Sequence, residues 1–277
     1  MNWWLELPLA EVSALNLAGL SPGIDPGLLA RIEDAGLNAS APPQQRWLDG
    51  WLLRFSPGKA KRARCVNAVA TGRHPLPWKL ARCAELFDAA GLPLIVRITP
   101  FTLPGELDSH LATHGLRRFD DTRVMVLTVL DSLEEPKVEA QPEVREIAAE
   151  PFAQHVGAMR GSSLAQRQAH AQRLANAPVP FTALELRDNG EVLACGQFAL
   201  EGDLVGLYDI FTAPLARGRG LARRLCQHLL VTARRRGAST AYLQVDSDNV
   251  VARLVYSRLG FTDGYSYHYR ARDPSAA

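Results

Sequence analysis

The residues whose types and spacing suit catalysis or ligand binding are concentrated in one loop near the C-terminal end. The loop lies within TAPLARGRGLARRLCQ, which runs from Thr212 to Gln227. It follows an apolar run, Leu204 to Phe211, that predicts a buried strand, and it leads into a stretch with the apolar spacing of a helix. Because the first N–H groups of a helix lack internal partners and carry partial positive charge, this order predicts a site for an anion such as a pyrophosphate.

Three phosphate-binding patterns combine a strand, a glycine loop and a helix, and their spacing separates them. The pattern GxxxxGK[ST] needs a Lys that does not follow these glycines, and GxGxxG needs a third glycine where Arg223 stands. Arg217, Gly220 and Ala222 instead fit R/Q-x-x-G-x-G/A, which resembles the acyl-CoA pyrophosphate loop of the GCN5-related N-acetyltransferases, the GNAT family. On the loop alone, a helix N-terminus with solvated arginines remains an alternative.

A second motif follows in the order that this family shows. After a helix that ends at Gly237, the run Thr240 to Val245 predicts a strand, and Asn249 to Gly260 predicts a short helix closed by glycine. Within this helix, the residues that resemble the family's second motif are Asn249, Ala252, Tyr256 and Leu259-Gly260-Phe261. With both motifs in this order, the chain resembles a GNAT acetyltransferase.

The length of 277 residues suits two domains of about 140 residues each. The helix-ending glycines Gly91 and Gly115 recur at almost the same separation as Gly237 and Gly260, which indicates an internal repeat. We predict an α/β protein of two GNAT-like domains, each a mixed, mostly antiparallel sheet flanked by helices. The ranges are 1–132 for a degenerate copy, 133–142 for a linker, and 143–277 for the catalytic copy. That any two α/β halves share an element order is the alternative.

Hydrophobic periodicity and turn residues predict the elements of both halves. The expected helices are 2–20, 28–37, 76–90, 107–114, 150–159, 163–176, the one that ends at Gly237, and 249–260. The expected strands are 47–55, 65–70, 94–99, 123–130, 144–147, 182–187, 192–200, 204–211, 240–245 and 265–270. In the first copy, Pro75 and Pro77 stand where the loop would need backbone donors.

The resemblance implies acetyl-CoA as co-substrate and assigns residues to it. The pantetheine arm would pair with the strand edge at Ile210, Phe211 and Thr212, and Asn249 would bond the arm from the other side. The pyrophosphate would meet the backbone N–H groups of Arg217, Gly218, Arg219, Gly220, Leu221 and Ala222.

The resemblance also implies direct attack of an amine on the thioester, with no covalent enzyme intermediate. Tyr256 is the candidate general acid, because a phenol stays protonated at neutral pH and can protonate a departing thiolate. A tyrosine that only caps the core is the structural alternative. Asp209, on the strand before the loop, is the candidate general base, and Glu185 and Asp246 remain alternatives.

Composition limits the other functions. A formal charge of +2 argues against nucleic acid or an anionic membrane as main partner, and Arg234 to Arg236 suit a helix C-terminus better than a nucleic-acid patch. Four separated cysteines without a CxxC pair suit the cytoplasm, with Cys83 and Cys226 as buried structural thiols. We expect neither a metal site, a signal peptide nor a membrane span. We expect the acceptor to be a primary amine of an amino acid, a small molecule, or a peptide or protein, but its identity and the oligomeric state are not predicted. A non-catalytic acyl-CoA sensor is the alternative function.

Overall fold

The computed structural model describes residues 19–58, 60–136 and 142–275, which form two compact units. The first unit draws on Met1–Ala30, Gln44–Arg123 and Gly264–Ala277, and the second on Arg31–Pro43 and Val124–Asp263. The predicted helix 2–20 lies almost entirely outside the described residues. The sequence predicted two copies of one fold, in the ranges 1–132 and 143–277. These domain ranges stay a prediction.

Strands of the first unit follow the order β1-β2-β3-β4-β11-β5. Their bounds are β1 Gln44–Leu48, β2 Trp51–Phe55, β3 Val66–Ala68, β4 Val96–Ile98, β5 Arg117–Leu127 and β11 Thr262–Ala271. The helices are α3 Leu76–Ala89 and α4 Leu107–Thr113. Helix α2 spans Pro26–Ala39, of which the part from Arg31 onward is assigned to the second unit. Side chains of α3 and α4, including Phe87 and Leu111, pack with β2, β3 and β4 into one buried cluster.

The predicted strand 47–55 is wrong in one respect, because it is a hairpin of β1 and β2. Asp49 and Gly50 form its turn with positive φ angles of 45° and 82°. An Asp-Gly pair favours this two-residue turn, since the glycine adopts positive φ at no steric cost. The alternating apolar residues on both sides hid the turn signal within one apparent strand.

The Asp49 carboxylate lies at the loop before α3. It accepts hydrogen bonds from the backbone N–H groups of Arg73 and His74, and the Lys79 ammonium lies 3.1 Å from it. Bonds from the His74 and Arg73 N–H groups hold the pKa of Asp49 well below its ordinary value. An internal carboxylate thus occupies backbone donors in this loop.

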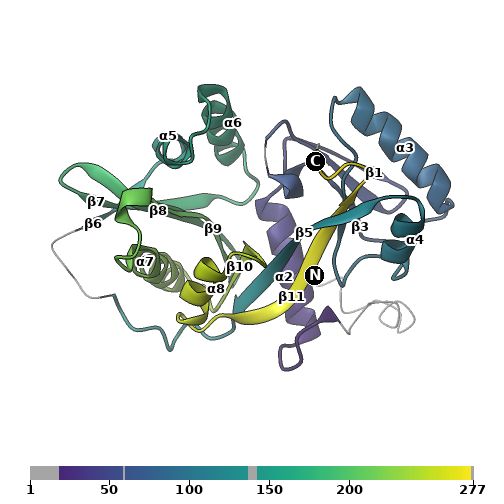
Figure 1. Ribbon diagram of the computed structural model, residues 1–277. Helices are drawn as coiled ribbons and strands as arrows, with labels where there is room; N and C mark the ends of the chain where they lie inside the picture. The colour runs from purple at the N-terminus through teal and green to yellow at the C-terminus, as the bar shows by residue number, and fades with distance from the viewer. Residues whose placement is uncertain (1–18, 59, 137–141, 276–277) are drawn as a thin grey trace. The chain divides into compact units, whose positions relative to one another are not determined.

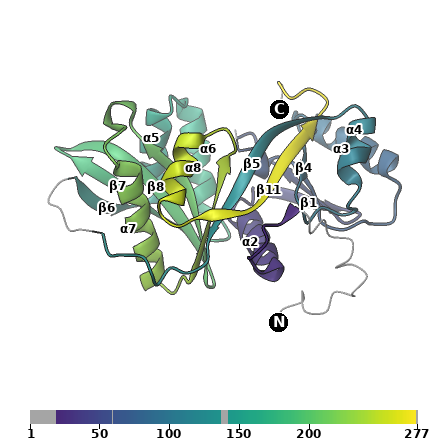
Figure 2. The same ribbon diagram turned by 60° about the horizontal axis from the view of Figure 1, so that its bottom comes forward.

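Strands of the second unit follow the order β10-β9-β8-β7-β6. Their bounds are β6 Glu143–Ile147, β7 Phe181–Asp188, β8 Glu191–Glu201, β9 Leu204–Thr212 and β10 Thr240–Asp246. The helices are α5 Ala149–Met159, α6 Leu164–Ala175, α7 Leu221–Arg235 and α8 Val250–Ser257. Strands β6 to β9 pair antiparallel, and β9 pairs parallel with β10. Helices α5 and α6 lie on one face of this sheet, and α7 on the other (Figures 1 and 2).

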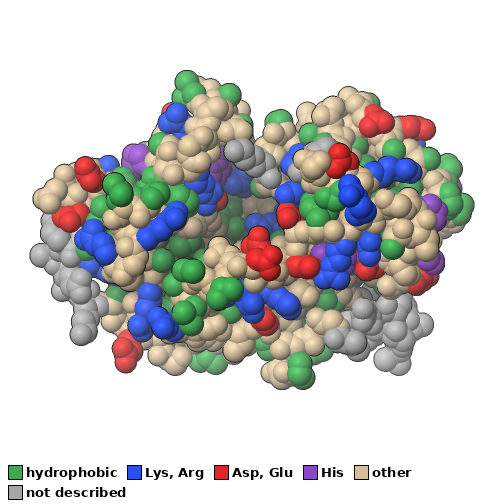
Figure 3. All heavy atoms as spheres, viewed as in Figure 1, with side chains coloured by type: hydrophobic (Ala, Val, Ile, Leu, Met, Phe, Trp, Pro, Cys, Tyr) green, Lys and Arg blue, Asp and Glu red, His purple; other side chains and the backbone are tan. Residues whose placement is uncertain are grey.

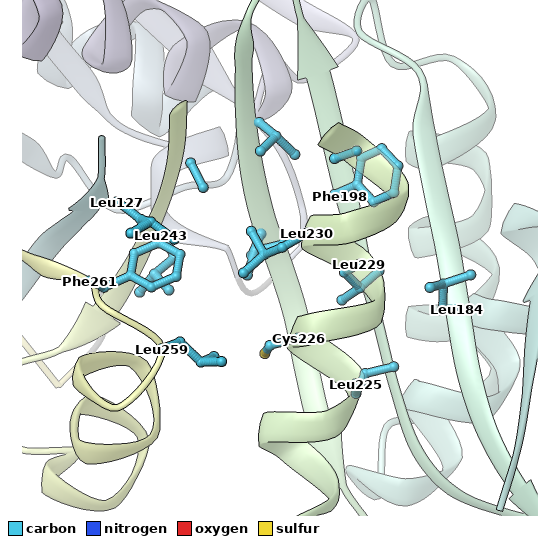
Figure 4. Packing of buried hydrophobic residues seen from close by; sticks show 14 of the residues in the cluster. Leu127, Leu184, Phe198, Leu225, Cys226, Leu229, Leu230, Leu243, Leu259 and Phe261 are labelled. Atoms are coloured by element: carbon cyan, nitrogen blue, oxygen red, sulfur yellow. The ribbon is translucent and has the colours of Figure 1, made fainter. Parts of the chain in front are cut away.

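Alternation along the strands produces these two faces. On β7, Leu184 joins the buried cluster around α7, whereas its neighbour Ala183 joins the cluster of α5 and α6 with Phe152. Figure 4 shows the cluster around α7, whose labelled members include Leu184, Phe198, Leu225, Cys226, Leu229, Leu230, Leu243, Leu259 and Phe261. The sheet of the second unit is therefore packed on both faces, and buried side chains fix the position of α7 on one of them.

The four cysteines, Cys65, Cys83, Cys195 and Cys226, are buried free thiols. Burial raises the pKa of Cys83, Cys195 and Cys226 to about 12 in each case. The prediction of buried thiols at Cys83 and Cys226 is confirmed.

The packing of α7 on the sheet predicts a large cost for truncating its buried face. Leu229 is fully buried in this cluster, so we expect Leu229→Ala to lower the free energy of unfolding by about 2–5 kcal/mol. Leu215→Ala is the matched control, because the Leu215 side chain is fully exposed. Urea denaturation measures both, and an equal loss in the two variants would contradict the packing described.

Candidate active site

Strands β9 and β10 pair for only part of their length. Their parallel register runs from Leu204 opposite Thr240 to Leu207 opposite Leu243, although β9 continues to Thr212 and β10 to Asp246. Beyond Leu207, no strand in the described part of the chain pairs with the edge of β9 that faces β10. Its last residues, including Ile210, Phe211 and Thr212, therefore present backbone groups that an extended ligand can pair with.

The loop between β9 and α7 presents a row of backbone donors. Gly218 and Gly220 have φ angles of 77° and 73°, and Gly220 is the residue before the first turn of α7. Within the described part of the chain, no hydrogen bond engages the N–H groups from Gly218 to Arg223. Arg217, Arg219 and Arg223 are exposed. Backbone donors, a helix N-terminus and cations thus converge, as anion binding requires.

Two predicted residues lie on α8. The Asn249 side chain accepts a hydrogen bond from the Ala252 N–H at 3.1 Å and so caps the helix, which leaves its amide donors for a ligand. Tyr256 packs against the α7 cluster and lies edge-on to Phe261, with ring centroids 6.2 Å apart. Hydrophobic side chains as well as Lys and Arg lie at the surface over α7 and α8 (Figure 3), and the exposed Val250, Val251 and Leu254 belong to α8.

The surroundings of Tyr256 keep its hydroxyl protonated. Burial, with a smaller effect of Cys226, raises the pKa of Tyr256 well above its ordinary value. Among the described residues, none makes a hydrogen bond to this hydroxyl. The phenol therefore has a proton to donate and no internal acceptor for it.

The backbone of Asp209 is unusual for a residue in a strand. It has a φ angle of 52°, and it lies where the pairing of β8 with β9 shifts register, between the Gln197–Tyr208 and Cys195–Phe211 pairs. A non-glycine residue at positive φ is strained, and such strain persists only where the surroundings impose it.

The contacts of Asp209 supply that constraint. One carboxylate oxygen accepts a hydrogen bond from Arg160 Nη1 at 2.7 Å, and the other accepts one from Gln197 Nε2 at 2.8 Å. His170 Nε2 lies 3.3 Å from the second oxygen. Burial raises the pKa of Asp209, but contact with His170 and the charges of Arg160 and His170 outweigh it and hold the pKa well below its ordinary value. The carboxylate is therefore a fixed anion at neutral pH.

A second histidine–carboxylate pair lies on the same face of the sheet. His155 Nδ1 lies 2.9 Å from Glu185 Oε2, and Arg187 Nε lies 2.8 Å from Glu185 Oε1. Glu185 stands opposite Cys195 on β8, which in turn stands opposite Phe211 on β9. Helices α5 and α6 thus bring two histidines against carboxylates of the sheet.

Among the predicted base candidates, Asp209 and Glu185 lie on the face covered by α5 and α6. Asp246 ends β10, where its carboxylate accepts the Asp248 N–H at 2.9 Å. The partner His170 was not predicted as a site residue, because its helix α6 carries no motif. A histidine or arginine on a helix facing an acidic strand was the one available signal.

The arginines at the end of α7 are held by acidic side chains. Arg234 and Arg235 pair with Glu135 at 2.6 and 2.7 Å, and Arg236 pairs with Glu146 at 2.8 Å.

Within residues 19–58, 60–136 and 142–275, no group of His, Cys, Asp and Glu suits a metal ion. No helix in those ranges is long and apolar enough to cross a membrane.

Comparisons with known proteins agree with this fold. The solved structures that this fold resembles include a GCN5-related N-acetyltransferase from Kribbella flavida, with a TM-score of 0.66, 18% identity, and coverage of 90% of this chain and 97% of that one. They also include a tandem GNAT protein from the clavulanic acid biosynthesis pathway, with a TM-score of 0.57, 15% identity, and coverage of 73% and 72%. The predicted α/β GNAT fold is confirmed.

The sequence comparisons extend this from fold to enzyme class. An uncharacterized N-acetyltransferase of Bacillus subtilis, YobR, is 27% identical over 237 residues, which are 82% of this chain and 92% of that protein. The chain is an N-acetyltransferase of the GNAT superfamily. It belongs to the family described as "Probable histone acetyltransferase Rv0428c C-terminal", whose model matches residues 29–270.

The fixed charge of Asp209 predicts a dependence of stability on pH. Because its pKa is lower in the folded than in the unfolded chain, the carboxylate stabilises the fold above the unfolded pKa, and this contribution is lost as pH falls below about 4. Asp209→Asn should therefore destabilise the protein at about pH 7 and show a smaller further loss at about pH 3 than the wild type.

Urea denaturation at both pH values measures this difference, with Asp131→Asn as the control because Asp131 is exposed. If the Asp209→Asn protein lost as much stability on acidification as the wild type, the ion pairs of Asp209 would not contribute to acid sensitivity.

Proposed function

We propose that the protein transfers an acetyl group from acetyl-CoA to a primary amine by direct attack of the amine on the thioester carbon. The observation that carries this proposal is that, among the residues that the structure describes, none bonds the N–H groups from Gly218 to Arg223 and none pairs with the edge of β9 that precedes them. One feature suits the pyrophosphate, and the other suits the amide groups of the pantetheine arm. Their adjacency along the chain matches a ligand that carries both.

The proposed cofactor contacts follow from these two features. The pyrophosphate is bound by the backbone of Arg217, Gly218, Arg219, Gly220, Leu221 and Ala222. The arm pairs with Ile210, Phe211 and Thr212, and the Asn249 amide donates from the other side. The range 143–277 is then the catalytic domain. In the range 1–132, Asp49 already occupies N–H groups of the corresponding loop, which supports a degenerate copy that binds no acetyl-CoA.

Tyr256 is proposed as the general acid. When the C–S bond breaks, the electron pair leaves on sulfur, and the phenol donates its proton to the thiolate. The raised pKa of Tyr256 and the absence of a hydrogen-bond partner among the described residues support this role. Asp209, which contacts Arg160 and His170, is proposed to take part in removing the proton of the incoming ammonium.

The acceptor is proposed as a primary amine of an amino acid, a small molecule or a peptide. Pairing of Arg234, Arg235 and Arg236 with acidic side chains is consistent with the expectation that nucleic acid is not a partner. The buried, free cysteines are consistent with a cytoplasmic location.

Tyr256→Phe tests the proposal directly. Thiol release from acetyl-CoA is measured with amino acids, polyamines, aminoglycosides and basic peptides, and calorimetry measures acetyl-CoA binding. We expect release with one acceptor class, and a kcat at least about ten-fold lower in the variant with little change in affinity, because the phenol acts only on the leaving group. An equal kcat would refute the acid role. Binding without release for every amine would instead indicate an acyl-CoA sensor.

Gly220→Ala tests the loop, with Gly202→Ala as the control. Both glycines have positive φ, 73° and 60°, and a Cβ at either meets nothing within 4 Å. Each substitution therefore adds backbone strain without a clash. Only Gly220→Ala should weaken acetyl-CoA binding, by about ten-fold if the strain falls on the bound loop. Calorimetry decides, and equal affinities in the two variants would argue against pyrophosphate binding at this loop.

A further inference from the structure

The two histidine–carboxylate pairs of the second unit differ in where they lie. His155 and Glu185 pair over β7, whereas His170 pairs with Asp209 on β9. Asp209 directly precedes Ile210 to Thr212, the segment whose edge has no strand partner. His170 therefore lies one side chain away from the strand segment to which the acyl donor is assigned.

Asp209 is badly suited to accept the proton itself. Its two oxygens contact Arg160, Gln197 and His170, so the carboxylate is already neutralised and hydrogen-bonded. A base efficient at neutral pH needs a proton affinity near that pH, and these contacts take Asp209 in the opposite direction. The same contacts suit the carboxylate to hold the Arg160 guanidinium and the His170 ring in place.

His170 has the arrangement that Asp209 lacks. Its Nε2 faces the carboxylate at 3.3 Å, and its ring stands edge-on to Phe152 with centroids 6.2 Å apart. Among the described residues, none bonds to Nδ1, and the side chain is 18% exposed. A carboxylate beside one ring nitrogen favours the proton on that nitrogen, so the lone pair is left on the other.

We propose that His170 accepts the proton of the incoming ammonium and that Asp209 is its positioning residue. The inference rests on the proposed acetyl transfer and names the base of that same site. Arg160 and Gln197 hold the carboxylate, and the positive φ of Asp209 directs it toward α6. Phe152 from α5 packs against the ring, which limits the orientations that the imidazole can take.

The reaction balances with these groups. One ammonium proton passes to His170 Nδ1, and the freed lone pair of the amine forms the C–N bond. The C–S bond breaks with its electron pair on sulfur, which takes the proton of the Tyr256 hydroxyl. The second proton lost by the nitrogen restores the phenol, and His170 releases its proton to solvent. The products are an N-acetyl amine and free CoA.

His170→Gln tests the assignment, and His155→Gln is the matched control because it alters the equivalent ring of the other pair. With the acceptor that supports thiol release, we expect kcat to fall by about 100-fold or more in His170→Gln and to stay near wild type in His155→Gln. Calorimetry should find unchanged acetyl-CoA affinity in both variants. A wild-type rate in His170→Gln, or an equal loss in His155→Gln, would overturn the assignment.

Asp209→Asn separates positioning from a merely structural role. His170 Nε2 faces the Asp209 carboxylate, which Arg160 also contacts, so Asp209→Asn removes the negative charge beside the ring and leaves the cation. The ascending limb of kcat against pH should move to lower pH, while the limb due to the amine substrate stays in place. An unmoved limb would overturn the positioning role.

NMR of the ring nitrogens provides a readout that needs no acceptor. In the wild type the proton of neutral His170 should reside on Nε2, and in Asp209→Asn that preference should weaken. A proton on Nδ1 in the wild type would overturn the assignment even if the enzyme is active. If the wild type binds no acetyl-CoA and releases no thiol with any amine, the proposed function itself fails, and the base assignment fails with it.

Discussion

The divergence of β9 from β10 is the constraint on which the site depends. Pairing stops after Leu207 and Leu243, although both strands continue. An unpaired strand edge inside a domain is costly unless water or a ligand satisfies its backbone groups. The core around α7 keeps the strands below the divergence together, so the open edge persists. The fold thus keeps backbone groups of β9 available for a ligand just before the loop and α7 begin.

On the face of the sheet that α5 and α6 cover, charged side chains rather than backbone groups form the site. Asp209 sits at the register shift with a strained φ, and Arg160 and His170 come to it from the end of α5 and from α6. Strain of this kind costs free energy, and ion pairs that are partly buried offset it. In the proposed reaction, β9 therefore serves two ligands, because its backbone pairs with the acyl donor and the Asp209 side chain lies on the side of the amine.

Local signals allowed most elements to be predicted from the sequence. Ser163 caps α6 with a reciprocal bond from Gln166, so the predicted start was correct to one residue. Asn249 likewise marks the start of α8, and the glycines of the loop have the positive φ that their motif requires. Such features depend on a few neighbouring residues, which is why a sequence records them directly.

The failures arose where distant residues decide the structure. The turn at Asp49 was hidden by apolar alternation on both sides. Asp209 was identified as a candidate base, but its partner His170 lies 39 positions earlier on a helix without a motif. Only the packing of α5 and α6 on the sheet brings these groups together. A sequence pattern finds an acid, whereas the fold decides what that acid does.

The buried cysteines should make the folded enzyme unreactive toward thiol reagents. Thiolates, not thiols, react with electrophiles, and pKa values of about 12 leave Cys83, Cys195 and Cys226 almost wholly protonated at neutral pH. In the folded protein, these three thiols should therefore react far more slowly than free CoA with a thiol reagent. Any labelling of these side chains would report opening of the cores in which they lie, so one reagent distinguishes turnover from unfolding in the same cuvette.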